Sequence, residues 1–432
     1  PLSGVDACNA GSMGADNILI LVNGTIALAN ELIISEALSI TGLGFENTVI
    51  AGGGQTRLIR INAPTDDILI EDLALVDGQT AGFLGGAAVL IECASRVRLR
   101  SVRMADNRAG GTGSGGAVLV NPDTDCHTRL DIAESIVRNN AAAGIGGALH
   151  INNVPLTGNE STRVDALSIE TTLFLLNASS QNGGAIAAKQ VPLISITDSH
   201  FDSNQAGPRD PGLARGGALS IRQSNSEGAT VLALIERSSF IFNFAEEGGA
   251  LYTGGDVVTI LRNATLFNNN TSSADSGTAI SATDDAIVAV YHSSMLNNGS
   301  GIAADVGLKA RSDAAVSLTH TIVATNWSTS AHCAATDGAT IESTGYTLDS
   351  GSSCSGHLSD LDNSDPQLGA LTAFNPPGAP FDQAVLIPME ESPVIDGGTP
   401  GSCPGPLGGS TTVDQRNRPP PVSAPSASPP SR

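Results

Sequence analysis

The sequence predicts an all-β fold, a right-handed single-stranded parallel β-helix with three short strands in each coil. The first observation is self-similarity at about 30 residues, marked by the tripeptide Gly-Gly-Ala. The second is a large apolar residue followed three positions later by asparagine. The third is the alternation of apolar and polar residues between these marks, as in residues 164–169, which is typical of strands. A chain that returns to its starting point every ~30 residues without helices stacks its short strands as parallel sheets.

Paired glycines mark one corner of each expected coil. They supply backbone conformations with positive φ, where a Cβ would clash. A weaker seventh copy starts at Gly277. The six full copies start at Gly85, Gly115, Gly146, Gly183, Gly216 and Gly248.

Recurrent asparagines mark a second corner. Asparagine suits turns because it tolerates the left-handed region and bonds to the local backbone. Stacked from coil to coil, the side-chain amides are expected to bond to one another, while the apolar residue three positions earlier points inward. The pairs are Met104/Asn107, Ile136/Asn139, Phe174/Asn177, Phe201/Asn204, Phe240/Asn243, Phe267/Asn270 and Met295/Asn298.

The pattern divides the chain into four regions. Residues 1–80 hold strand-like runs at 17–22, 32–34, 38–40, 48–50, 58–61 and 68–70, which indicate an N-terminal cap and the first coils. Residues 81–325 carry the regular repeats. Residues 326–417 lose the Gly-Gly-Ala rhythm and become rich in Gly, Ser, Pro and Asp. Residues 418–432 are rich in Pro and Ser, and we expect a disordered tail there.

Composition limits the partners. The 432 residues include 49 glycines and only 3% aromatics, which favours a long, thin core. The net charge of −22 argues against nucleic acid and anionic membranes as partners, and is compatible with a bound cation such as Ca²⁺, although no cofactor is required. No apolar run approaches the ~20 residues of a membrane span.

Because Pro1 follows no targeting pattern, we expect a mature or excised fragment.

The six cysteines indicate an oxidising compartment. None forms the close pair of a zinc or redox site. Cys333 and Cys354 flank 20 residues rich in Gly, Ser and Thr, which a disulfide would close. Cys93 and Cys126 lie one repeat apart, and either pair on adjacent coils or remain reduced in the core. Cys8 and Cys403 have no evident partner.

Several motifs resemble a known group of proteins. Gly-Gly-Ala together with Phe-x-x-Asn is similar to the repeat of polymorphic outer-membrane proteins and related bacterial β-helix surface proteins. Residues 343–350, Cys354, residues 365–369, residues 392–398 and residues 414–416 resemble, in that order, the C-terminal choice-of-anchor Q region of such proteins. The opening coils at 16–18 and 38–44 resemble the first coil of secreted β-helices. The resemblance implies export to the cell surface or beyond, and does not imply one activity.

Two departures from that family pattern are visible. The family usually closes with a cysteine and an acidic-aromatic ending after Asp-Gln-Arg, whereas here Arg416 leads into Pro-rich sequence. Cys403 therefore lacks its usual partner, and the family's anchor is not recognisable.

An adhesive or structural role, including self-assembly, is favoured because it requires no convergent set of catalytic residues. The expected partners are extracellular glycans, surface proteins or copies of the same chain, at an extracellular or cell-surface location. The alternative is a polysaccharide lyase, hydrolase or epimerase acting on acidic glycans, in a pectate-lyase-like solenoid. A lyase needs a base and a cationic group near the sugar carboxylate.

The candidates for glycan contact are basic residues. Arg96, Arg98 and Arg100 alternate onto one strand face, where they either grip uronates or are ordinary surface charges. His150 and Lys189 each follow a Gly-Gly-Ala strand in successive coils. Adjacent carboxylates occur at residues 66–67 and 284–285, but neighbours on a strand point to opposite faces, and turn roles are favoured over hydrolysis.

Overall fold

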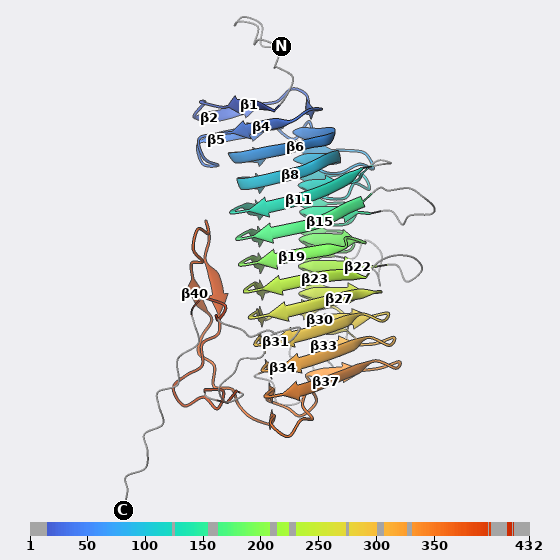
Figure 1. Cartoon of the computed structure of the whole chain (residues 1–432), viewed down its shortest axis with the longest axis vertical. Coiled ribbons are helices and arrows are strands. Elements are labelled where there is room, and N and C mark those ends of the chain that lie inside the picture. Colours follow the sequence, from blue (N-terminus) through green and yellow to red (C-terminus); the bar gives the residue numbers. More distant parts are fainter. Residues whose placement is uncertain are drawn as a thin grey trace, which may run out of the picture.

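The computed structural model describes residues 15–122, 126–153, 163–207, 214–223, 230–273, 276–299, 306–325, 331–395, 397–398, 413–416 and 418. The regular elements within these ranges are all strands, so no described helix is available to cross a membrane. Figure 1 shows the strands as successive layers of one long stack, with the N-terminal strands at one end and β37 near the other. The predicted right-handed parallel β-helix is confirmed.

Each coil contributes three strands to three long faces, and all pairings along these faces are parallel. The strands β6 (Ile59–Val76) and β8 (Val89–Ala105) run through all three faces without a break. The other strands of the first face are β3 (Leu32–Ile34), β10 (Val118–Val120), β14 (Leu149–Asn152), β18 (Ile186–Lys189), β22 (Leu219–Arg222), β26 (Leu251–Gly254), β30 (Gly277–Thr283), β33 (Val306–Ala310) and β36 (Cys333–Ala335).

The second and third faces follow in the same order in every coil. The second face holds β1 (Asp16–Leu19), β4 (Leu38–Thr41), β11 (His127–Ala133), β15 (Arg163–Glu170), β19 (Leu193–Thr197), β23 (Val231–Glu236), β27 (Val257–Arg262), β31 (Ile287–Tyr291), β34 (Ala315–Thr319) and β37 (Thr340–Gly345). The third face holds β2 (Gly24–Ala27), β5 (Thr48–Ala51), β12 (Ile136–Arg138), β16 (Leu173–Leu175), β20 (His200–Asp202), β24 (Ser239–Ile241), β28 (Thr265–Phe267), β32 (Ser294–Leu296), β35 (Ile322–Ala324), β38 (Leu348–Asp349) and β39 (Leu361–Asp362).

A fourth, shorter strand completes the coils in the middle of the stack. These two-residue strands form a separate parallel sheet at the corner after the third face, an element that the three expected strands did not include. They are β7 (Gln79–Thr80), β9 (Arg108–Ala109), β13 (Ala141–Ala142), β17 (Ala178–Ser179), β21 (Gln205–Ala206), β25 (Phe244–Ala245) and β29 (Asn270–Thr271).

The glycine pairs lie at the corner before the first face, and the two glycines have different tasks. Gly115 has φ of +68°, a left-handed conformation that favours glycine. A Cβ on Gly116 would lie 2.0 Å from the carbonyl oxygen of Gly147 on the next coil. In the first copy the left-handed residue is Gly86, not Gly85, because the strand register aligns Val89 with Val118. The other left-handed members are Gly146, Gly183, Gly216 and Gly248, as expected.

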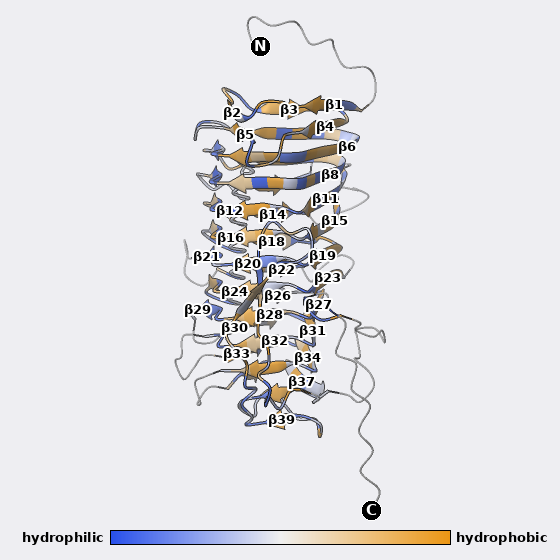
Figure 2. Ribbon diagram, turned by 90° about the vertical axis from the view of Figure 1, so that its left-hand side faces the viewer, coloured by the Kyte–Doolittle hydropathy of each residue, from blue (hydrophilic) through white to orange (hydrophobic). Residues whose placement is uncertain are grey.

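Inward-pointing side chains form one continuous apolar core along the stack. Figure 2 shows hydrophobic colour along most of the face strands. In the middle of the third face, the rings of Phe174, Phe201 and Phe240 are parallel, with centroids 4.9 Å apart at each step. This spacing matches the distance between neighbouring strands of a sheet. The stacked rings therefore fill the core in the same register as the backbone ladder.

A buried asparagine ladder runs beside this core. The Oδ1 of Asn204 accepts hydrogen bonds from both the backbone N–H and the side-chain amide of Asn177, at 3.1 and 3.0 Å. Asn204 in turn donates its Nδ2 to the carbonyl of Phe174 and to Asn243 Oδ1. The ladder consists of Asn107, Asn140, Asn177, Asn204, Asn243, Asn269 and Asn298.

At two coils the ladder residue is the neighbour of the asparagine that the sequence pattern selects. Asn140 takes the place expected for Asn139, and Asn269 the place expected for Asn270. The inward residues are correspondingly Val137 and Leu266. Asn139 is exposed at the turn with φ of +54°, so the local Asn-Asn repeats conceal the true register.

The expected disulfide between Cys333 and Cys354 is present, and Cys93 and Cys126, for which the sequence left two alternatives open, are paired as well. Cys93 and Cys126 join adjacent coils, and Cys333 and Cys354 close the loop at the C-terminal end of the stack. Asp349 holds that loop, since its carboxylate accepts the N–H groups of Gly351, Ser353 and Cys354 at 2.7–2.8 Å and contacts the His332 ring. Burial acts to raise the pKa of Asp349, but the His332 ring and the N–H groups of Cys354 and Gly351 together lower it. Cys8 and Cys403 lie outside the described residues.

The stack continues past residue 325, the boundary that the rhythm of the sequence suggested. Strands β36, β37 and β38 pair with the strands of the preceding coil. The chain then turns back, and the antiparallel hairpin of β40 (Thr372–Phe374) and β41 (Gln383–Val385) lies along the side of the stack (Figure 1). Ser239 donates its hydroxyl to the Ala384 carbonyl and accepts from Gln415, which fixes the hairpin to the third face. Except for Arg418, the expected tail at 418–432 lies outside the described residues.

Candidate functional site

The arginines of the second face are paired with carboxylates. Arg98 contacts Asp67 at 2.7 Å, and Arg100 contacts Glu134 at 3.3 Å. Arg96 forms an ion pair with Asp131, which also binds Arg129. The coils therefore place an acidic side chain beside each of the three expected glycan-contact arginines. Their charge is largely neutralised, and the strand face has the alternating charges of an ordinary solvated surface.

His150 and Lys189, by contrast, lie together in a pocket on the first face. Its volume is about 500 Å³, which is in the range of pockets that hold small organic ligands. We name it the Lys189 pocket. Its described lining residues are Ile145, His150, Asn152, Asn182, Ala187, Ala188, Lys189, Ser220, Arg222 and Gln223.

The pocket exists because small side chains follow one another in an outward-facing column. Strand register places Leu119, His150, Ala187, Ser220 and Tyr252 side by side on successive coils. Ala187 and Ser220 are short, while the residues on either side of them are large. Two coils therefore leave space above the sheet, and at ~4.8 Å per coil the step from His150 to Ser220 spans about 10 Å.

Two cations stand at the rim of the pocket. Lys189 and Arg222 are partners in the ladder between β18 and β22, so their side chains leave the sheet one coil apart. Lys189 is exposed and Arg222 is half-buried. Among the described residues neither forms an ion pair, in contrast to Arg96, Arg98 and Arg100. In a chain with net charge −22, this corner has a local positive charge.

Polar atoms in the pocket have unused hydrogen-bonding capacity. Nδ1 of His150, Oγ of Ser220 and Oε1 of Gln223 are buried and have no partner among the described residues. Burial lowers the pKa of His150 to about 4, and the neighbouring Lys189 charge acts in the same direction. The imidazole is therefore neutral near pH 7 and offers both a donor and an acceptor nitrogen. Buried polar groups of this kind normally have partners, which a bound ligand would supply.

Below the pocket, the guanidinium groups of Arg215 and Arg222 lie over the ring of Tyr252. The Tyr252 ring centroid lies 4.9 Å from the Arg215 guanidinium carbon and 5.9 Å from that of Arg222. Glu247 binds Arg215 at 3.0 Å and Arg311 at 2.6 Å. The Tyr252 hydroxyl forms a hydrogen bond with Thr283 Oγ1 at 2.8 Å. The Tyr252 ring, fixed through its hydroxyl, thus supports Arg222 at the edge of the pocket.

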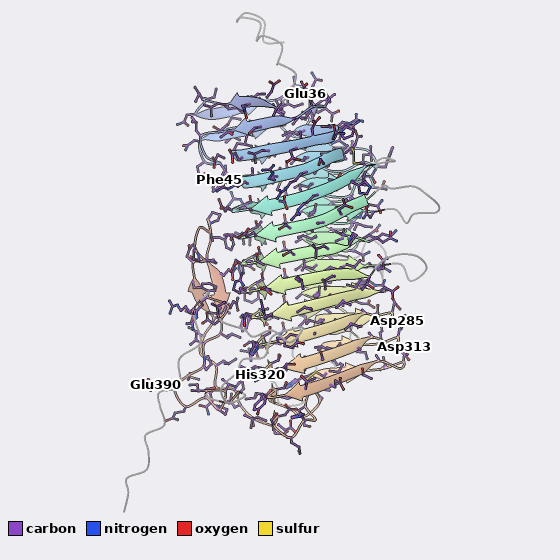
Figure 3. All side chains as sticks on the ribbon, viewed as in Figure 1. Glu36, Phe45, Asp285, Asp313, His320 and Glu390 are labelled. Carbon is purple, nitrogen blue, oxygen red and sulfur yellow. A yellow bond between two sulfur atoms is a disulfide. The ribbon has the colours of Figure 1, made fainter. Side chains whose placement is uncertain are left out.

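The described lining of the Lys189 pocket contains no carboxylate. The adjacent pair at residues 284–285 lies instead at a turn, with φ of +56° and +65°, and Figure 3 shows Asp285 at the edge of the stack. Asp67 is occupied by Arg98. Among the described residues no group of three His, Cys, Asp or Glu side chains is arranged to hold a metal ion. The described lining therefore offers two cations, a hydroxyl, amides and a neutral imidazole.

A second hollow lies between the stack and the C-terminal segment, with a volume of about 320 Å³. Its wall is a column of rings, in which the His320 centroid is 4.9 Å from both His292 and Tyr346. Burial, together with the nearby His292, lowers the pKa of His320 to about 4. Pro393, Val394 and Gly398 line the opposite side. This hollow is a contact region between segments of the chain rather than an open cationic site.

Comparison with protein-family models gave no match, and comparison with curated proteins found no similar sequence. The sequence pattern had singled out His150 and Lys189 because each follows a glycine pair in successive coils. The ladder aligns Lys189 with Asn152 rather than with His150, so the two residues are offset by two positions. It did not select Arg222, Ser220 or Gln223. Arg222 follows Lys189 by 33 residues, one coil, so the repeat length itself was the signal that would have found it.

Proposed function

We propose that this chain is an exported cell-surface β-helix with an adhesive or structural role, which binds acidic glycans in the Lys189 pocket. The observation that carries the proposal is the pair Lys189 and Arg222, two cations without carboxylate partners among the described residues, beside buried polar atoms that need partners. Carboxylates bind such cations through charge-assisted hydrogen bonds, and sugar hydroxyls satisfy the neutral groups.

The architecture and the disulfides support the extracellular part of the proposal. A stacked repeat is a rigid rod that carries a binding site away from its point of attachment. Disulfides persist in oxidising compartments, and two join pairs of cysteines here. The likeness of the repeats to those of polymorphic outer-membrane proteins, and of the C-terminal region to choice-of-anchor Q segments, points in the same direction. Surface proteins and copies of the chain are further proposed partners.

A polysaccharide lyase is the second candidate function. It is favoured by one observation, the position of Lys189 next to the neutral His150 and one coil from Arg222. In β-elimination a base removes the proton beside the carboxylate, a cation stabilises the charge that develops, and the glycosidic C–O bond at C4 breaks as the C4–C5 double bond forms, its oxygen taking a proton from solvent. The neutral imidazole of His150 would serve as the base, and Lys189 and Arg222 as the cations. Hydrolysis is not favoured, since the described lining holds no pair of carboxylates.

One experiment separates binding from cleavage. The purified chain is titrated with short oligosaccharides of alginate, polygalacturonate and hyaluronan, which present terminal as well as internal uronates, while ultraviolet absorbance of unsaturated sugar ends is followed. We expect binding that weakens with salt and no rise in absorbance. The Lys189→Gln/Arg222→Gln double variant should lose this binding, whereas the control Arg100→Gln, at an exposed ion pair on another face, should retain it. Rising absorbance would establish the lyase, and the absence of binding to all three oligosaccharide series would refute the proposal.

A further inference from the structure

The Lys189 pocket is closed in both directions along the stack. Above it, Leu119 in the same outward column is only 4% exposed. Below it, Tyr252 is 1% exposed beneath Arg215 and Arg222, and the next residue of the column, Ser281, is fully buried. The pocket floor is itself little exposed, since Ala187 is 5% and Ser220 2% exposed, so the ends of the pocket are set by side-chain size rather than by exposure. The column changes from the short Ala187 and Ser220 to the larger Leu119 and Tyr252, and a polymer laid along the axis of the coils would have to pass over these larger side chains.

The pocket is also short. Its floor, from His150 to Ser220, spans about 10 Å, and its volume is about 500 Å³. Asn152, on the rim beside His150, donates its amide to Asn121 at 3.5 Å, which closes the upper rim further. A ligand that fills this space has to enter across the strands rather than along the axis of the coils, and only its terminal unit fits inside.

We infer that the Lys189 pocket recognises a single carboxylated sugar at the end of a glycan chain, rather than an internal segment of a polymer. This inference rests on the proposed acidic-glycan function and specifies its ligand. The terminal carboxylate binds between Lys189 and Arg222, whose side chains leave the sheet one coil apart. The remainder of the glycan leaves through the open side of the pocket.

The neutral groups of the pocket suit the rest of such a sugar. Ser220 Oγ and Gln223 Oε1 lack partners among the described residues and lie where ring hydroxyls would reach. Ala187 leaves room for the ring and offers an apolar floor. The neutral His150 supplies a further donor or acceptor at the upper end. A simple inorganic anion would satisfy the cations and leave these three polar groups without partners.

The test compares three trisaccharides of identical composition, each with one glucuronate and two neutral glucose units, by isothermal titration calorimetry. The first carries glucuronate at its non-reducing end, and the second carries it in the middle. A third trisaccharide with glucuronate at the reducing end covers the opposite polarity. We expect one of the two terminal forms to bind at least tenfold more tightly than the internal form, because the internal form cannot seat its carboxylate between the two cations.

Variants of the pocket locate the site. Lys189→Gln and Arg222→Gln should each weaken binding of the preferred trisaccharide about tenfold or more. Ala187→Phe should abolish it by filling the floor, while Ala187→Ser, which preserves the space, should retain it. Arg100→Gln is the control for charge and should bind as the parent chain does. Thermal melting of each variant monitors the fold.

The outcomes separate this inference from the proposed function. Equal affinity for the internal and both terminal forms, or undiminished binding by Ala187→Phe, would overturn the terminal-sugar inference and leave acidic-glycan binding intact. Failure of all trisaccharides and of the uronate oligosaccharides to bind would overturn both.

Discussion

The asparagine ladder permits a sharp prediction, because two adjacent asparagines differ in role. Asn140 accepts two hydrogen bonds from Asn107, at the backbone N–H and at the side-chain amide. It donates two more, to the Met104 carbonyl and to Asn177 Oδ1. Asn140→Ala removes all four and leaves buried polar groups without partners. At about 1 kcal/mol for each net hydrogen bond, the coil should lose about 4 kcal/mol of local stability.

Asn139→Ala is the matched control. Asn139 is exposed, and its main contribution is tolerance of the left-handed turn at φ +54°. Alanine in that conformation costs about 1 kcal/mol. Native-state hydrogen exchange is the suitable assay, because repeat proteins open locally and a single unfolding free energy is not well defined for them. Exchange of the Asn107 amide should accelerate about a thousandfold in Asn140→Ala and less than tenfold in Asn139→Ala. Equal effects of the two substitutions would refute the ladder.

Two further predictions concern the corners and pH. Gly116→Ala should lower the local stability of its coil by about 3 kcal/mol, because its Cβ would lie 2.0 Å from the Gly147 carbonyl oxygen. Gly82→Ala, with open space around it, should change the local stability by less than about 0.5 kcal/mol, and native-state hydrogen exchange measures both changes. Burial lowers the pKa values of His150, His200 and His320 to about 4. The unfolded chain binds protons at these histidines from about pH 6.5 downward, so stability should be full above pH 6.5 and decline toward pH 4. A melting temperature that stays constant over this window would contradict the assignment, and His200→Gln should flatten part of the decline.

The sequence predicted the coil because its marks come from local chemistry. The left-handed corner needs glycine at Gly115, and the inward ring needs a large apolar residue at Phe174, so both recur with the repeat. The sequence pattern alone could not decide which asparagine of each run enters the ladder. Residues 139–140 and 268–270 are consecutive asparagines, and only the packing of Val137 and Leu266 into the core decides which amide enters the ladder.

The candidate site depended on contacts across coils, which single-strand patterns do not contain. Arg96, Arg98 and Arg100 form a basic stripe when β8 is considered alone. Their acidic partners come from neighbouring coils, about 30 residues away in the chain. The pocket likewise arises from a column, in which the small Ala187 and Ser220 stand between larger residues. Aligning the repeats at the observed register would have revealed both features.

The central claim is that residues about 30 positions apart lie side by side along one axis. Ser168 and Ser317 stand in one column, separated by the five pairing steps through Ser195, Leu234, Ile260 and Ala289. Nitroxide labels are attached to cysteines that replace Ser168 and Ser317, in a chain lacking Cys8 and Cys403. The two labels should be about 24 Å apart by pulsed electron–electron double resonance. Labels at Ser195 and Ser317 should be shorter by one step, about 5 Å. Distances that do not change by one coil spacing between the two pairs would contradict the parallel stack.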